Sequence, residues 1–172
     1  MKVQKIALLD VLLAVTIVIA ILESFIPSFI IPGIKLGFAN IIILVTLYEV
    51  GIWEAAFINL VRVLIVSLVR GTFLSMGFFM SLTGAFLSLG VMILFYLVIR
   101  KFSIIGVSVI GSLFHVIGQI LIAIIYMGSV YVVLYLPIIA LAAVITGVLV
   151  GFIARAIIKT GVIKNQREKY NF

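Results

Sequence analysis

A few polar residues lie inside long apolar stretches of the sequence, and their types and spacing suit ligand binding. Asn59 and Arg62 are three residues apart within the run FINLVRVLIVSLVRG, and His115 and Gln119 are four residues apart in a second run. On a helix, each pair would share one face. A charge at the centre of a bilayer costs about 2.5–3.5 kcal/mol on insertion scales, so Arg62 is a functional candidate.

Four further polar residues fall near the ends of apolar stretches and complete the candidate ligand-binding set: Glu23, Lys35, Asn40 and Arg70. The whole set holds three cations against one carboxylate. Positive charge that no acid balances suits an anionic or partly anionic ligand. We therefore expect a small, anionic or amphipathic organic ligand.

Structural interpretations of the same residues stay open. Lys35 and Arg70 are also typical of anchors at a membrane interface. Arg62 would equally be stabilised by an ion pair with Glu23. His115 and Gln119 would serve as a hydrogen-bonding clip between helices.

The elements that position these residues must be membrane helices. Of the 172 residues, 66% are hydrophobic and 10% are charged, and the mean hydropathy is +1.53. Soluble domains have a much more polar composition. The sequence therefore predicts an all-α polytopic membrane protein that contacts lipid.

The sequence offers little for catalysis. It has no cysteine, one histidine and five acids, and the acids form no Asp-rich pair for a magnesium diphosphate. Neither a zinc-binding HExxH motif nor a phosphate-binding loop is present. We expect no enzymatic activity, no metal and no cofactor, and we interpret the net charge of +7 as topological information instead of nucleic-acid binding.

About 20 apolar residues are needed for one membrane crossing. By this criterion the chain divides into six segments. They are residues 6–26, 36–50, 54–70, 74–99, 103–127 and 131–158. Residues 1–158 form one domain, the first segment is a retained helix, and residues 159–172 form a polar tail. The gap at 27–35 contains Pro27, Pro32 and Gly33, and we expect it to be a lid or binding loop.

Basic residues predict the orientation of the helices. In a six-helix scheme eight of them fall on one side: Lys2, Lys5, Arg100, Lys101, Lys159, Lys164, Arg167 and Lys169. Only Lys35 and Arg70 fall on the other side. By the positive-inside rule, both termini and the tail lie in the cytoplasm, and the candidate residues lie between the midplane and the outer surface.

Small residues recur at helical spacing in two segments. They are Gly77, Ser81, Gly84 and Ser88 in the fourth segment and Ala143, Gly147 and Gly151 in the sixth. Such stripes allow the backbones of membrane helices to approach closely. A docking face for another membrane protein is the alternative interpretation.

Several runs resemble a bacterial membrane family, heptaprenyl diphosphate synthase component I, also called the Gx transporter family. The runs are PGIKLGFANIIIL (32–44), LVRVLIVSLVRGTFLS (60–75), GAFLSLGVM (84–92), GVSVIGSLFHVIGQ (106–119) and YLPIIALAAVITGVLVG (135–151). The resemblance implies a location in the bacterial cytoplasmic (inner) membrane. The family name implies a prenyl synthase subunit as partner.

That family is more distantly similar to the substrate-binding S-components of energy-coupling factor (ECF) importers. This similarity implies a six-helix bundle, an outward-facing ligand site, and a coupling subunit with ATPases as partners. S-components dock through an Ala-xxx-Ala spacing on the first helix. Here Ala14 is followed by Val18 and then Ala20, so the chain departs from that pattern.

Two functional hypotheses follow. The first is an S-component-like substrate-binding protein for uptake, with the ligand between the third, fifth and sixth helices under the 27–35 loop. The second is a non-catalytic membrane subunit associated with heptaprenyl or polyprenyl diphosphate or quinone synthesis. An outward-facing site favours the first hypothesis, and a site that faces the cytoplasm favours the second.

Overall fold

The computed structural model describes residues 2–25, 37–98 and 102–165, and every regular element in these ranges is a helix. The elements are α1 (Lys2–Ser24), α2 (Asn40–Glu49), α3 (Ile52–Val69), α4 (Met76–Val98), α5 (Ile104–Met127), the 3₁₀ helix η1 (Val130–Tyr135) and α6 (Leu136–Thr160). The predicted all-α membrane bundle is confirmed. The predicted 27–35 loop lies outside the described residues.

Five of these helices, namely α1, α3, α4, α5 and α6, are long and apolar enough to cross a membrane. The second predicted segment, residues 36–50, contains a helix of only 10 residues, α2. At a rise of 1.5 Å per residue α2 is about 15 Å long, half of the roughly 30 Å hydrocarbon core. This helix therefore cannot span the bilayer by itself.

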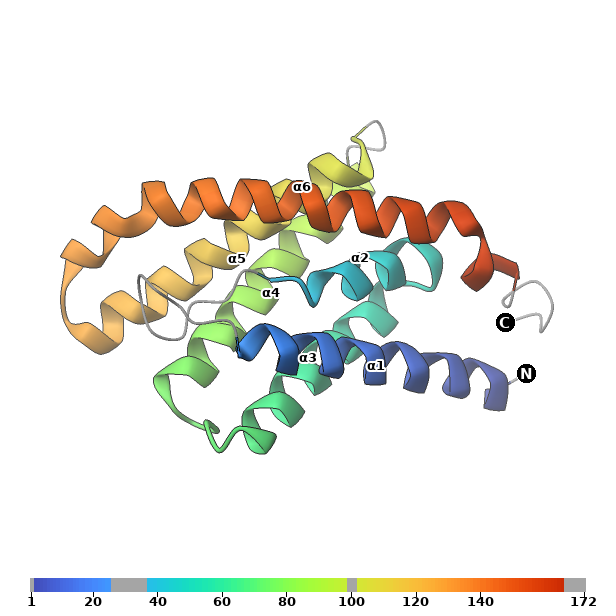
Figure 1. Ribbon diagram of the computed structural model, residues 1–172, viewed down its shortest axis with the longest axis horizontal. Helices are drawn as coiled ribbons and strands as arrows, with labels where there is room; N and C mark the ends of the chain where they lie inside the picture. Colours follow the sequence, from blue (N-terminus) through green and yellow to red (C-terminus); the bar gives the residue numbers. More distant parts are fainter. Residues whose placement is uncertain (1, 26–36, 99–101, 166–172) are drawn as a thin grey trace.

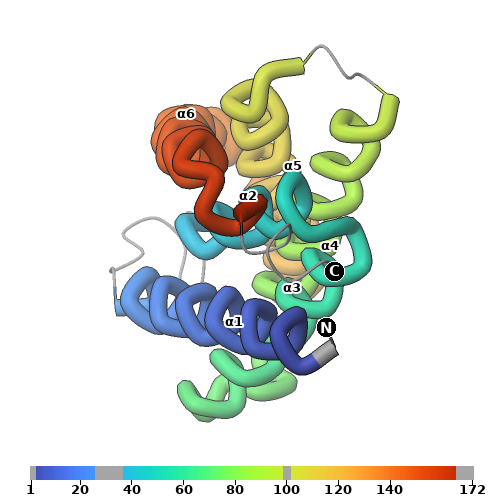
Figure 2. The backbone as a smooth tube through the Cα atoms, turned by 90° about the vertical axis from the view of Figure 1, so that its right-hand side faces the viewer, coloured from blue at the N-terminus to red at the C-terminus, as the bar shows by residue number. Residues whose placement is uncertain are grey.

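The short helix α2 lies in the interior of the bundle. All of its residues from Asn40 to Leu47 are buried, and it contacts α6, α3 and α1 (Figure 2). Its isoleucine and leucine side chains form the largest core cluster together with Leu12 from α1 and Val150 from α6. Protein, and not lipid, therefore surrounds most of this helix.

Glycines set the packing of α4, α5 and α6. A Cβ added to Gly118 of α5 would lie 2.8 Å from the Cα of Gly84 on α4. On the other side of α5, a Cβ on Gly147 of α6 would lie 2.8 Å from the Cα of Val109, and one on Gly151 would lie 2.7 Å from the Cα of Ile105. Gly84 of the predicted α4 stripe, and Gly147 and Gly151 of the predicted α6 stripe, therefore pack against α5 within this chain.

The two ends of the bundle differ. At the terminal end, where α1 begins and α6 ends, Lys5 Nζ donates to Glu54 Oε1 at 2.5 Å and ties α1 to the start of α3 (Figure 1). At the far end lie the last turn of α1, the turn between α3 and α4, and η1 (Figure 1). The candidate site lies toward this far end.

Candidate functional site: a buried polar cavity

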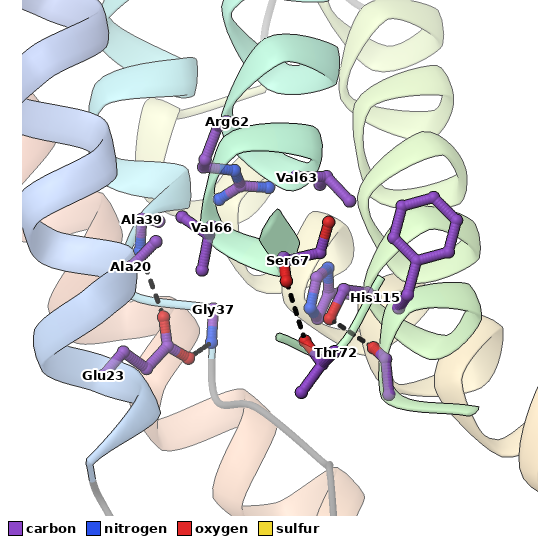
Figure 3. A pocket seen from close by; sticks show the side chains of 13 residues that line it. Ala20, Glu23, Gly37, Ala39, Arg62, Val63, Val66, Ser67, Thr72 and His115 are labelled. Carbon is purple, nitrogen blue, oxygen red and sulfur yellow. Dashed lines mark hydrogen bonds between the residues drawn. The ribbon is translucent and has the colours of Figure 1, made fainter. Parts of the chain in front are cut away.

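A small cavity lies between α1, α3, α4 and α5, next to the residues that lead into α2. Its volume is about 30 Å³, room for about one or two water molecules. It is lined by Ala20, Glu23, Gly37, Ala39, Arg62, Val63, Val66, Ser67, Thr72, Gly77, Phe78, Ser81 and His115. Arg62, Glu23 and His115 thus reach one space from three helices (Figure 3).

Arg62 is the cation of the cavity. Its side chain is 5% exposed, and its Nη2 donates to Asn59 Oδ1 at 2.7 Å, one turn earlier on α3. Asn59 Nδ2 in turn donates to the backbone carbonyl of Ala85 on α4 at 3.0 Å. Asn59 therefore fixes the guanidinium and links α3 to α4. A guanidinium carries five N–H donors, so Arg62 has the capacity to donate to an oxygen-bearing group in the cavity as well as to Asn59.

Glu23 is the acid of the cavity. Its carboxylate accepts hydrogen bonds from the backbone N–H of Gly37 and, at 3.5 Å, of Ala39, directly before α2 (Figure 3). The side chain is 7% exposed, and its charge acts on Arg62 although no ion pair within 4 Å joins these two residues. Glu23 thus joins the end of α1 to the start of α2, a position that favours an anion.

His115 comes from the middle of α5 and is 4% exposed. The imidazole lies against Gly84, where an added Cβ would be 3.2 Å from His115 Cε1 and 2.7 Å from the His115 carbonyl oxygen. Glycine at position 84 therefore allows the close approach of α4 to the backbone of α5 at His115. The packing of α4 on α5 therefore places an imidazole at the cavity wall.

The other predicted site residues lie outside the cavity lining. Gln119 is fully buried against Gly84, and Asn40 Nδ2 donates to Ser88 Oγ at 3.4 Å, a link from α2 to α4. Arg70 is exposed at the end of α3. Lys35 lies outside the described residues. The described residues thus bring Glu23, Asn59, Arg62 and His115 together, and Asn59 acts through Arg62.

The described part of the lining differs from the predicted site in two respects. Among the described residues that line the cavity there is one cation, Arg62, and one carboxylate, Glu23. The cavity is also bounded by α1 and α4, whereas the described lining includes no residue of α6. Sequence spacing does not reveal which helices become neighbours, and this explains the difference.

Sequence reasoning missed several polar groups of the cavity. Ser67 and Thr72 come from the end of α3 and the turn after it, and Thr72 Oγ1 donates to the Ser67 carbonyl at 3.4 Å. Ser81 belongs to a stripe of small residues whose spacing indicates a face for helix packing or for docking of another membrane protein, not a ligand site. The backbone donors of Gly37 and Ala39 have no sequence signature, because every residue except proline carries an N–H.

The donor set favours binding of a polar group over metal chemistry. Within the described ranges no three His, Asp or Glu side chains lie close enough together to hold a metal ion. A guanidinium, an imidazole and hydroxyl groups surround the space instead. Such groups recognise a phosphate-like or carboxylate-like oxyanion or a carbonyl oxygen.

Comparison with known protein families gives one match. The family model of heptaprenyl diphosphate synthase component I matches residues 12–157, which is most of the chain. The chain belongs to this family. No curated protein and no solved structure matches the chain significantly. The match includes every described residue that lines the cavity, so the cavity is part of the family domain.

Proposed function

We propose that this chain is a non-catalytic membrane component of heptaprenyl diphosphate synthesis. The observation that carries the proposal is the family match over residues 12–157, on a bundle with five helices apolar enough to span a membrane. The family name implies a second component, and we assign the chain elongation chemistry to that partner subunit. The acids of this chain form no Asp-rich pair for a magnesium diphosphate, which supports this division of work.

The cavity suggests what the membrane component contributes. Prenyl diphosphates combine an oxyanion head with a long apolar tail, and the quinones made from them carry carbonyl or hydroxyl oxygens. Arg62 offers charge-assisted donors to such a head, while Ala20, Val63, Val66 and Phe78 line the same space with apolar surface. We propose that the chain holds an amphipathic isoprenoid by its head. With about 30 Å³ of space, the cavity must open to admit it.

The test reconstitutes the purified chain in liposomes with the soluble prenyl elongating subunit from the same organism. Labelled isopentenyl diphosphate then reports the amount and length of the product. We expect the membrane chain to raise the yield of heptaprenyl product, and Arg62→Leu to remove most of this increase. Arg70→Leu is the matched control, because Arg70 is exposed and outside the cavity lining. Equal synthesis with and without the membrane chain would contradict the proposal.

A second candidate is S-component-like uptake of an anionic or amphipathic molecule. The position of the cavity favours it, because the cavity lies toward the far end of the bundle, away from the ends of α1 and α6 that carry the termini (Figure 1). If the termini are cytoplasmic, as the basic residues predict, the cavity opens toward the outer leaflet.

A reporter that is active only in the cytoplasm tests this orientation. Fused to the C-terminus, it should give signal in whole cells. An external signal would place the cavity in the cytoplasmic half and leave the uptake hypothesis without its supporting observation. Mass spectrometry of the small molecule retained on purification then separates the candidates: an isoprenoid supports the synthesis role, and a water-soluble nutrient supports uptake.

A further inference from the structure

The helices that form the walls of the cavity differ in how closely they pack against their neighbours. On the α4–α5 side, backbones meet through Gly84 and Gly118, and α3 is tied to α4 by Asn59. Helix α1 is the least buried of the five long helices: 22% of the residues in its apolar stretch are buried, against 50% in α5. The wall that α1 provides is therefore the one that can move at the smallest cost.

In the part of the chain that the structure describes, one side chain of α1, Glu23, makes a polar contact with another element at the cavity. Glu23 lies in the last turn of α1, and its carboxylate accepts from the N–H groups of Gly37 and Ala39 (Figure 3). The other polar tie of α1 in the described residues, Lys5 to Glu54, lies at the terminal end, far along the same helix. Loss of the Glu23 contact would therefore release the cavity end of α1 and leave its other end attached.

The carboxylate of Glu23 is an oxyanion, like the head group that we propose the cavity binds. A carboxylate held by backbone N–H groups before a helix is the arrangement in which proteins commonly bind phosphate. The buried Arg62 faces the same space, and its charge interacts with Glu23 at a distance longer than an ion pair. The guanidinium-bearing Arg62 and the carboxylate-bearing Glu23 both line the cavity (Figure 3).

We propose that Glu23 is a built-in competitor for the anionic head of the ligand. The carboxylate occupies the backbone donors before α2 and holds α1 against the cavity, so the site is closed when no ligand is present. An entering oxyanion takes over these donors together with Arg62, and repulsion between the two anions drives Glu23 and the end of α1 outward. The inference rests on the proposed function, because it assumes an anionic head.

Binding of inorganic diphosphate to the purified chain in nanodiscs tests the competition. Glu23→Gln keeps an acceptor oxygen but removes the charge, and a neutral acceptor binds backbone donors about half as strongly. We expect this variant to bind diphosphate about tenfold more tightly than the wild type. The advantage should disappear when Arg62→Leu is added. Glu54→Gln is the matched control, because this acid lies at the terminal end of the same helix pair.

A distance measurement reports on α1 without any ligand. The chain has no cysteine, so spin labels can be attached at introduced cysteines alone. Leu22→Cys on α1 and Leu121→Cys on α5 are both exposed and report the cavity wall, while Leu121→Cys with Leu141→Cys on α6 reports the rigid part. We expect Glu23→Gln to lengthen and broaden the first distance and to leave the second unchanged.

The outcomes separate this inference from the proposed function. If Glu23→Gln changes neither the α1–α5 distance nor diphosphate affinity, or weakens binding, Glu23 is not a competitor. If the membrane chain then still raises heptaprenyl yield, the proposed function stands alone. If the variant lengthens the distance and tightens binding while the wild-type chain leaves synthesis unchanged, the competitor is supported and the role in synthesis is wrong.

Discussion

The α4–α5–α6 side of the bundle and the α1 side are built by opposite means. On the first side, Gly118 meets Gly84, and Gly147 and Gly151 meet the backbone of α5, so the contacts are between backbones. On the second side, α1 carries mostly branched apolar residues, and polar side chains at its two ends make the links, namely Lys5 and Glu23. Backbone contacts admit little rearrangement, whereas a few side-chain hydrogen bonds can exchange partners.

This difference assigns separate tasks to the two sides. The rigid side holds His115 and Ser81 in place as the fixed wall of the cavity. The α1 side holds Glu23 on a helix with little buried surface. A site with one fixed and one movable wall can recognise a head group precisely and still admit it from the membrane.

The largest effect is expected when the rigid side is broken. Gly118→Leu would place a side chain where a Cβ alone lies 2.8 Å from the Cα of Gly84. Overpacking of this kind costs about 3 kcal/mol or more, which lowers the melting temperature by about 6–12 °C. Thermal unfolding in detergent measures the change. The control is Gly90→Leu on α4, where an added Cβ meets no atom within 4 Å. An equal fall in melting temperature in both variants would contradict the importance of the backbone contact between Gly118 and Gly84.

Removal of the cavity cation should affect binding more than folding. Arg62→Leu deletes the charge-assisted donors, each worth about 1.5–3 kcal/mol, so we expect diphosphate affinity to fall by about 10- to 100-fold. The variant also leaves Glu23 buried without its counter-charge, which destabilises the protein.

The double variant Arg62→Leu with Glu23→Leu separates these two effects. We expect its melting temperature to return toward the wild-type value, because neither charge then remains in the cavity, while binding stays weak. Titration calorimetry and thermal unfolding on the same preparations report both quantities. If the double variant recovers full affinity, Arg62 is a structural partner of Glu23 and not a ligand-binding residue.

His115 should contribute moderately to binding from the fixed wall. It lines the cavity, and an imidazole N–H can donate to an oxyanion. We expect His115→Gln to weaken sulfate binding about three- to tenfold. Among the described residues, Arg62 and Glu23 are the charged groups that line the cavity. Unchanged sulfate affinity in His115→Gln would show that the histidine does not contribute.

The smallest effect is expected at the terminal end. The Lys5–Glu54 pair is partly exposed, with 40% and 18% of the two side chains accessible. Such pairs contribute about 0.2–1 kcal/mol and are screened by salt. We expect Lys5→Ala to lower the melting temperature by at most about 4 °C, less at high salt, and to leave the α1–α5 distance at the cavity unchanged. A longer distance in this variant would show that α1 is fixed mainly from this end.

The helical segments could be predicted from the sequence. Apolar length and polar interruptions predicted the six helical segments, since each long helix here must be apolar along its whole length. Two segments differ: α2 begins only at Asn40, and the sixth segment is divided into η1 and α6. An apolar helix buried in protein and one that faces lipid have the same composition, so the sequence did not show that α2 lies inside the bundle.

The candidate site could be predicted from the sequence only in part, because the sequence shows contacts within a helix but not contacts between elements. The three-residue spacing of Asn59 and Arg62 predicted their contact, because it follows from helix geometry. Contacts between separate elements, such as Glu23 of α1 with the backbone N–H of Gly37 before α2, depend on the packing of all helices together. The exposure of Arg70 depends on where α3 ends relative to its neighbours, and spacing does not record this.

The interior position of α2 has a consequence for how the protein is made. A nascent helix leaves the insertion machinery by partitioning into lipid, but α2 has only 10 residues and is too short to cross the hydrocarbon core. Its partners on one side belong to α6, including Val150 and Ala154, which are synthesised about a hundred residues later. Stable insertion of α2 must therefore wait for the last helix, and truncation before α6 would leave the second helix without a place in the membrane.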